Sequence, residues 1–265
     1  MKPRSPYEDI AHAYLRLNNF LILSNFVIEL NTKSRPGFEI DIIAYRPKGA
    51  VEYSIKTLTY NESIDSIFYG KFECDNEFIK KLSQLYEKTK SKTISESSII
   101  KKYNIALIGD VKSYKYDLWN NKSHRSKEEK KSIMKIKIAY VLTLFGIKPN
   151  KKGKILQGIT EKLVNQAFYI DDDQKIIILL AGFARRNRPS SGNKGIKASK
   201  GSLECRKSSL GISYLYIPLE HTISFICSRI RQYYDEKSRS RALYPNPSFS
   251  VLTLLDPKCH WESKK

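Results

Sequence analysis

The chain has 265 residues, of which 47 are Lys or Arg and 27 are Asp or Glu, so its formal net charge is +20. Apolar residues make up 41% of it and include 17 Tyr and 11 Phe, which predicts a large core and excludes a chain that is disordered throughout. No run approaches the ~18 apolar residues of a membrane span. The charge predicts an anionic partner, with nucleic acid favoured over an acidic membrane surface or a surface that is lysine-rich only for solubility.

The chain begins with a predicted helix that is followed by strands. Ser5 is a suitable N-cap, Pro6 suits the first turn, and Glu8 stands at the capping-box position. Apolar residues recur at helical spacing as far as Leu17. A polar turn is expected at 31–37. Strands are predicted at 20–30, 38–45 and, as a shorter element, 51–59.

A long polar stretch separates these strands from the next apolar run. Residues 57–103 are mostly compatible with helix, and we interpret them as an insertion. Residues 105–109 form a short apolar run, which is typical of a strand buried on both faces. Asp110, Val111 and Lys112 follow directly.

The second half of the chain predicts a mixed α/β protein. Residues 127–145 form a basic amphipathic helix whose apolar side carries Ile133, Ile136, Ala139, Tyr140 and Leu144. The other predicted elements are helices at 160–168, 219–234 and 246–255, strands at 175–183 and 212–217, and a basic loop at 185–207. We therefore expect a mixed sheet flanked by helices in residues 1–185, a basic flexible loop at 186–207, and a strand and helices at 208–265 that pack on the core.

Acidic residues on two strands are the candidates for chemistry. Asp41 lies within an apolar strand, where a carboxylate is costly to bury unless it is paired or binds a metal, and Glu39 shares its face. Asp110 and Lys112 share one face of a later strand. Two converging carboxylates suit Mg²⁺ or Mn²⁺, and a lysine beside them can position a water for attack on a phosphodiester. The plainer interpretation is an ordinary ion pair between Asp110 and Lys112.

These segments resemble the PD-(D/E)XK nuclease superfamily over roughly residues 5–185. The resemblance is carried by the helix that contains Glu8, by Glu39-Ile40-Asp41 and by Gly109-Asp110-Val111-Lys112-Ser113. It implies a restriction-endonuclease-like core, made of a helix, three strands, a helix and a strand, and an endonuclease that hydrolyses phosphodiester bonds, with DNA favoured over RNA. The implied site has Asp41, Asp110, Glu8 and the Val111 carbonyl as ligands of Mg²⁺ or Mn²⁺, and Lys112 as the residue that activates water.

The sequence leaves several alternatives open. Ser54-Ile55-Lys56 follows Asp41 at a more usual spacing, but Ser54 would then replace an acidic ligand. Glu8 is explained equally well as a capping residue. A nucleic-acid-binding protein on the same fold, without catalysis, is the second hypothesis.

Two basic segments are predicted to bind nucleic acid. In 112–137, Tyr114, Tyr116 and Trp119 alternate with cations and suit stacking, although Trp119 is equally suited to packing on the helix that follows. The loop 185–207 is the second. The candidate contact residues are Lys115, Tyr116, Arg125, Lys127, Arg185, Arg186 and Arg188.

Partners and compartment follow from weaker signals. No membrane partner is expected, and a homodimer is compatible with cutting two strands. The four cysteines form no C-x-x-C pair and the first residues have no apolar leader, so we expect a cytoplasmic or nucleoid-associated protein.

Overall fold

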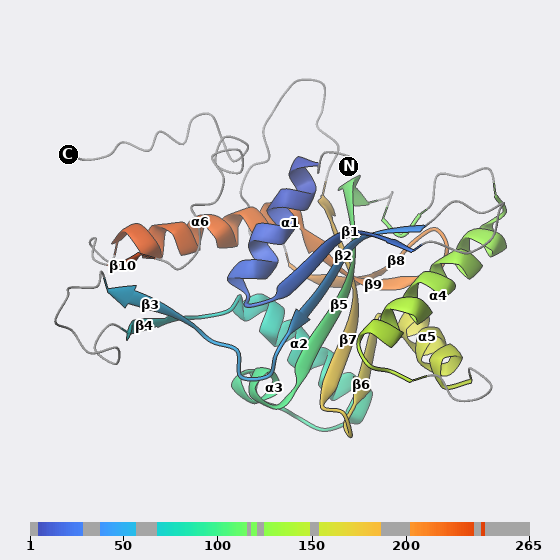
Figure 1. The fold of residues 1–265 in the computed structure, drawn as a ribbon, viewed down its shortest axis with the longest axis horizontal. Coiled ribbons are helices and arrows are strands. Elements are labelled where there is room, and N and C mark those ends of the chain that lie inside the picture. Colours follow the sequence, from blue (N-terminus) through green and yellow to red (C-terminus); the bar gives the residue numbers. More distant parts are fainter. Residues whose placement is uncertain are drawn as a thin grey trace.

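Seven strands form the central sheet of the computed structural model, and helices cover both of its faces (Figure 1). The structure describes residues 5–28, 38–56, 68–115, 118–120, 125–148, 154–186, 202–235 and 240–241. Within them, no helix is both long enough and apolar enough to cross a membrane. The predicted α/β class, with a mixed sheet flanked by helices, is confirmed.

The central sheet runs in the order β1-β2-β5-β7-β9-β8, and β6 pairs with the first half of β7. Its strands are β1 (Leu21–Ile28), β2 (Phe38–Arg46), β5 (Asn104–Tyr114), β6 (Phe168–Asp171), β7 (Ile176–Arg185), β8 (Glu204–Lys207) and β9 (Ser213–Pro218). β5, β7 and β9 are parallel neighbours, whereas β1, β2, β6 and β8 each pair antiparallel with the strand beside them. The two central strands β5 and β7 are largely apolar and buried on both faces, as the sequence predicts for parallel strands.

Two helical layers enclose this sheet. One is formed by α1 (Pro6–Leu17), α2 (Asn76–Lys90), α3 (Glu96–Lys102) and α6 (Leu219–Asp235), and the other by α4 (Lys127–Leu144) and α5 (Lys154–Gln166). Ser5 caps α1 by accepting a hydrogen bond from the Glu8 amide, as predicted. A reciprocal capping box between Ser126 and Glu129 begins α4, which leads the chain from β5 to its parallel neighbour β7.

Three of the described strands form a second, smaller sheet, which is not paired with the central one. It consists of β3 (Glu52–Lys56), β4 (Phe68–Phe72) and β10 (Ser240–Arg241), in the order β10-β3-β4. The predicted strand at 51–59 is therefore present, but it pairs antiparallel with β4 and β10. Lys56 thus belongs to a different sheet from Asp41.

Several predicted details are wrong. In α4, Ile136, Tyr140 and Leu144 are exposed, and the buried stripe instead contains Met134, Ile138, Val141 and Leu142. This half of the helix is apolar on nearly every side, so spacing alone could not choose the stripe. The short strands β4, β6 and β8 were not predicted. The predicted turn at 31–37, the helix at 246–255 and most of the basic loop lie outside the described residues.

Gly182 on β7 occupies a position where a side chain does not fit. A Cβ atom there would lie 2.9 Å from Tyr214 Cδ2 and 3.0 Å from Leu118 Cδ1, and Tyr214 and Leu118 are both buried. We expect Gly182→Ala to lower the free energy of unfolding by about 1–3 kcal/mol because the core must shift to admit a methyl group. Chemical denaturation measures this loss. Gly158→Ala on α5, where a Cβ meets nothing within 4 Å, is the control that should not destabilise the protein.

Candidate active site

The antiparallel pairing of β2 with β5 brings two carboxylates together. Ile42 pairs with Gly109, so one further step in the same register places Asp41 opposite Asp110. Directly opposite residues project to the same face of a sheet. The Val111 amide donates to Asp41 Oδ2 at 2.8 Å, which fixes this carboxylate against the neighbouring strand.

Lys112 bridges the two carboxylates. Its Nζ lies 2.8 Å from Asp41 Oδ2 and 2.8 Å from Asp110 Oδ1. Because one atom reaches both oxygens, these oxygens are at most twice that distance, about 5.6 Å, from each other. The structure therefore brings together Asp41, Asp110 and Lys112, which are distant in sequence but were predicted to form one site.

The second oxygen of Asp110 is held by the segment that follows β5. The Trp119 amide donates to Asp110 Oδ2 at 2.6 Å, and the Trp119 indole Nε1–H donates to the Ala181 carbonyl at 3.2 Å. Trp119 has a left-handed φ of 55° and is buried. The indole is thus packed in the core and cannot serve as an exposed stacking surface. Its role in fixing Asp110 was not predicted, because a contact between a loop amide and a side chain nine residues earlier follows no sequence pattern.

A small cavity of about 20 Å³ opens beside the carboxylates, enough for about one water-sized sphere. It is lined by Glu39, Ile40, Asp41, Ile108, Gly109, Asp110, Trp119, Met134, Lys137 and Ile138. Lys137 comes from α4, and its Nζ donates to the Glu39 carbonyl at 2.8 Å. The sequence analysis missed Lys137 as a site residue. Its position one turn after Met134 and one turn before Val141, which are both buried, is the signal that could have indicated it.

Burial and charge shape the ionisation of the site. Burial raises the pKa of Asp110; the Lys112 ammonium opposes this rise and the Asp41 carboxylate adds to it. Burial lowers the pKa of Lys112, but Asp110 and Asp41 raise it by more, so its net pKa lies above the usual value. Burial also lowers the pKa of Lys137, although Asp110 and Asp41 oppose that change. The acids and the two amines therefore act on one another as a single charged cluster.

Glu8 lies near this cluster but is engaged by its own helix start. The Ser5 hydroxyl donates to Glu8 Oε1 at 3.1 Å. Burial raises the pKa of Glu8, Ser5 opposes the rise, and the charges of Asp41 and Glu39 add to it. The contacts with Ser5 therefore support the interpretation of Glu8 as a capping residue. The role of Glu8 as a metal ligand stays a prediction. Glu39 is exposed, as expected for a solvated strand residue.

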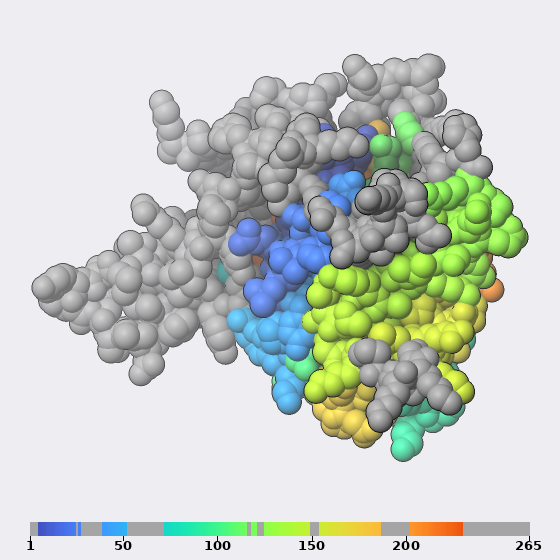
Figure 2. Space-filling view, turned by 45° about the vertical axis from the view of Figure 1, so that its right-hand side comes forward, coloured from blue at the N-terminus to red at the C-terminus, as the bar shows by residue number. Residues whose placement is uncertain are grey.

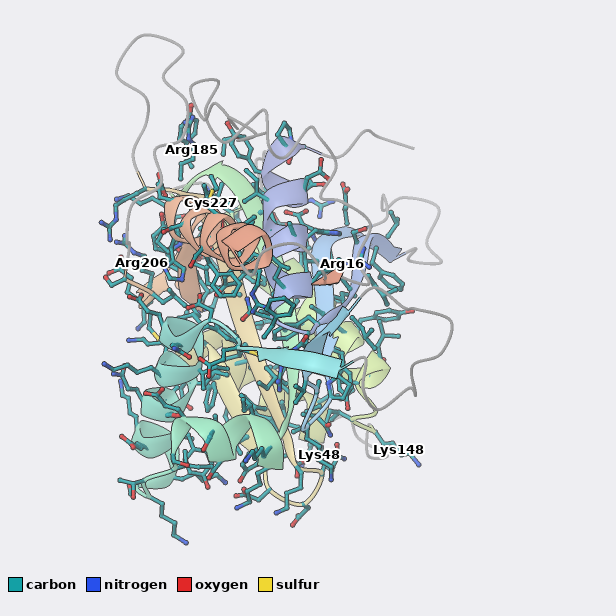
Figure 3. The ribbon with its side chains drawn as sticks, turned by 90° about the vertical axis from the view of Figure 1, so that its left-hand side faces the viewer. Arg16, Lys48, Lys148, Arg185, Arg206 and Cys227 are labelled. Atoms are coloured by element: carbon teal, nitrogen blue, oxygen red, sulfur yellow. The ribbon has the colours of Figure 1, made fainter. Side chains whose placement is uncertain are left out.

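Two of the predicted contact residues, Arg185 and Lys115, lie at one end of the central sheet. Arg185, labelled in Figure 3, is the last residue of β7. It pairs with Tyr114 of β5, and Lys115 directly follows Tyr114. The neighbouring Arg186 amide donates to the Glu220 carboxylate at 3.1 Å. Arg125 is partly buried ahead of α4, and Lys127 is exposed in its first turn. Tyr116 and Arg188 lie outside the described residues.

The carboxylate pair is chemically suited to a divalent cation. Mg²⁺ in enzymes is commonly held by one or two carboxylates together with water and substrate phosphate. In the described ranges no third Asp, Glu, His or Cys joins the pair to form a larger metal-binding group. The Val111 backbone enters the site through its amide, and a role for its carbonyl as a ligand stays a prediction. Asp41 and Asp110 would thus supply the protein's charged ligands.

Comparison of the chain with known protein families, with curated proteins and with solved structures found no match. The function is therefore inferred from the geometry of Asp41, Asp110 and Lys112.

Proposed function

We propose that the protein is a metal-dependent nuclease with a restriction-endonuclease-like core. The observation that carries this proposal is the contact of one lysine amine with two carboxylates on adjacent strands. The order of elements also agrees with the helix, three strands, helix and strand that the resemblance implies. Without the insertion between β2 and β5, the chain runs through α1, β1, β2, β5, α4 and β7. The net charge of +20 favours a nucleic-acid substrate, with DNA preferred.

Each residue of the site has a role in this proposal. Asp41 and Asp110 hold Mg²⁺ or Mn²⁺, which when bound lowers the pKa of water and neutralises a phosphate. Lys112, fixed by both acids, orients the attacking water with its ammonium group and stabilises developing negative charge. The Val111 and Trp119 amides keep the carboxylates in place, so that little reorganisation is needed during the reaction. In this proposal Lys115, Arg185 and Lys127 are the residues that contact the phosphate backbone.

Removal of either carboxylate tests this assignment. We expect Asp41→Asn and Asp110→Asn to reduce the cleavage of plasmid DNA in Mg²⁺ or Mn²⁺ by at least about a hundredfold, because each removes a charged ligand. Nicking and linearisation on agarose gels measure the rate. Asp173→Asn, which changes an exposed turn carboxylate, is the matched control and should cleave normally. Full activity in both site variants would contradict the proposal.

A binding protein without catalysis is the second candidate. The favouring observation is that Lys112 already neutralises part of the charge on Asp41 and Asp110 without any metal. This candidate requires salt-sensitive DNA binding that Asp110→Asn leaves unchanged. Calorimetric titration with Mn²⁺ separates the two: heat of binding that Asp110→Asn abolishes supports the nuclease, and its absence in the wild type supports the binding protein.

A further inference from the structure

Lys137 lines the same small cavity as Asp41 and Asp110, but it comes from a helix. It belongs to α4, which packs on one face of the sheet and forms part of the surface seen in Figure 2, whereas Asp41 and Asp110 belong to the sheet itself. Its Nζ is placed by a 2.8 Å hydrogen bond to the Glu39 carbonyl. This bond fixes the position of the amine, and Lys137 brings its positive charge to the lining of the cavity.

The charges of Asp41, Asp110 and Lys112 indicate what a further cation at the position of Lys137 can do. Asp41 and Asp110 together carry two negative charges and Lys112 carries one positive charge. A phosphodiester and a divalent cation bring the total to zero, but an attacking hydroxide adds a further negative charge. That charge develops on the phosphate oxygens in the transition state, and a fixed cation beside them is stabilising at that moment. Lys137 is a fixed cation in the lining of this cavity, whereas Lys112 contacts both carboxylates without lining the cavity.

We propose that Lys137 is a further catalytic residue that contacts a non-bridging oxygen of the phosphate on which the site acts. This inference rests on the proposed nuclease function. It assigns the two lysines different tasks: Lys112 is held by the carboxylates and orients water, and Lys137 holds the phosphate from the helical side of the cavity. The substrate group is a nucleic-acid phosphodiester. Lys112 approaches it from β5 and Lys137 from α4.

The test replaces Lys137 and compares two readouts. In Lys137→Met we expect kcat for DNA cleavage in Mg²⁺ to fall about 10²–10³-fold, as for the loss of one transition-state donor. We also expect the slope of log K against log salt for binding to duplex DNA, measured in Ca²⁺, to lose about 0.9, the value for one phosphate contact. Lys137→Arg should restore the slope and part of kcat. Binding of Mn²⁺, measured by calorimetry, should persist in both variants.

Matched controls separate this role from a structural one. Lys135→Met changes another lysine of α4, which pairs with Glu161 on α5, and should alter neither kcat nor the salt slope. If Lys137→Met is unstable in thermal unfolding, Lys137→Gln provides the same readouts in a side chain that retains polarity. A salt slope that remains at the wild-type value in a folded variant overturns the inference. A reduced slope with unchanged kcat also overturns it, because Lys137 would then only bind the backbone.

The outcomes also distinguish this inference from the proposed function. If the wild type cleaves DNA and Asp110→Asn does not, while Lys137→Met cleaves normally, the nuclease stands and the role of Lys137 fails. If the wild type does not cleave under any metal tested, the nuclease proposal fails and the catalytic role of Lys137 fails with it. In that case the salt slope still measures whether Lys137 contacts phosphate.

Discussion

Replacement of Lys112 with methionine is expected to abolish DNA cleavage and to destabilise the metal-free protein. Cleavage should fall about 10²–10⁴-fold, because the group that orients and activates the water is removed. The free energy of unfolding should fall by about 3 kcal/mol, the lower end for a broken buried ion pair, because the Lys112 side chain is one-third exposed. Asp41 and Asp110 then face each other without a cation between them.

Metal should rescue the stability of this variant but not its activity. A divalent cation bound by both carboxylates replaces the positive charge of the missing amine, so Mg²⁺ should raise the Tm of Lys112→Met by more than it raises the Tm of the wild type. Thermal unfolding with and without Mg²⁺ measures the difference. Lys48→Met, which changes an exposed lysine in the turn after β2, should show neither the loss of stability nor the larger Mg²⁺ shift. No Mg²⁺ shift in Lys112→Met would show that the carboxylates bind no cation, and equal shifts in the two proteins would show that the cation does not replace the charge of Lys112.

The sequence predicted the central geometry of the site because its determinants are local. Alternation along β2 and β5 fixes the faces of Asp41, Asp110 and Lys112, and the apolar runs around them identify both strands as buried. The structure adds the register that places Asp41 opposite Asp110. It also shows that the rival lysine, Lys56, lies on a strand that pairs in the other sheet.

The unpredicted features depend on tertiary contacts. Lys137 joins the site only because α4 packs with Met134 and Ile138 toward the sheet. The second half of α4 is apolar on nearly every side, so the sequence did not show which side would face the sheet. The contact of the Trp119 amide with Asp110 depends on a left-handed backbone that has no sequence signal in a Trp residue. β4, β6 and β8 are four- or five-residue strands, too short for a periodic pattern to identify.

Substitution of Asp75 by alanine is expected to cause the largest loss of stability outside the site. Asp75 is buried where α1, α2 and α6 meet; its Oδ2 accepts from the Tyr14 hydroxyl at 2.6 Å and lies 2.5 Å from His221 Nε2. Its Oδ1 accepts from the Glu77 amide and caps α2. Asp75→Ala should lower the free energy of unfolding by about 3–5 kcal/mol, because it leaves buried polar partners unsatisfied and removes a cap.

The effect of Asp75 should depend on pH in a defined direction. Burial raises the pKa of Asp75, but hydrogen bonds from His221 and Tyr14 lower it by more, so its net pKa is below the usual value. The unfolded chain therefore takes up a proton at this carboxyl first as the pH falls. The stabilising contribution is complete above about pH 4, the ordinary pKa of Asp, and is lost as the pH falls further through the folded-state pKa. Urea unfolding at pH 7 and at pH 3 should thus give a smaller difference between wild type and Asp75→Ala at pH 3.

Ser95→Ala, which removes the exposed cap of α3, should cost about 1 kcal/mol at both pH values. An Asp75→Ala loss as small as that of Ser95→Ala would show that the contacts among Tyr14, Asp75 and His221 do not stabilise the junction of the three helices.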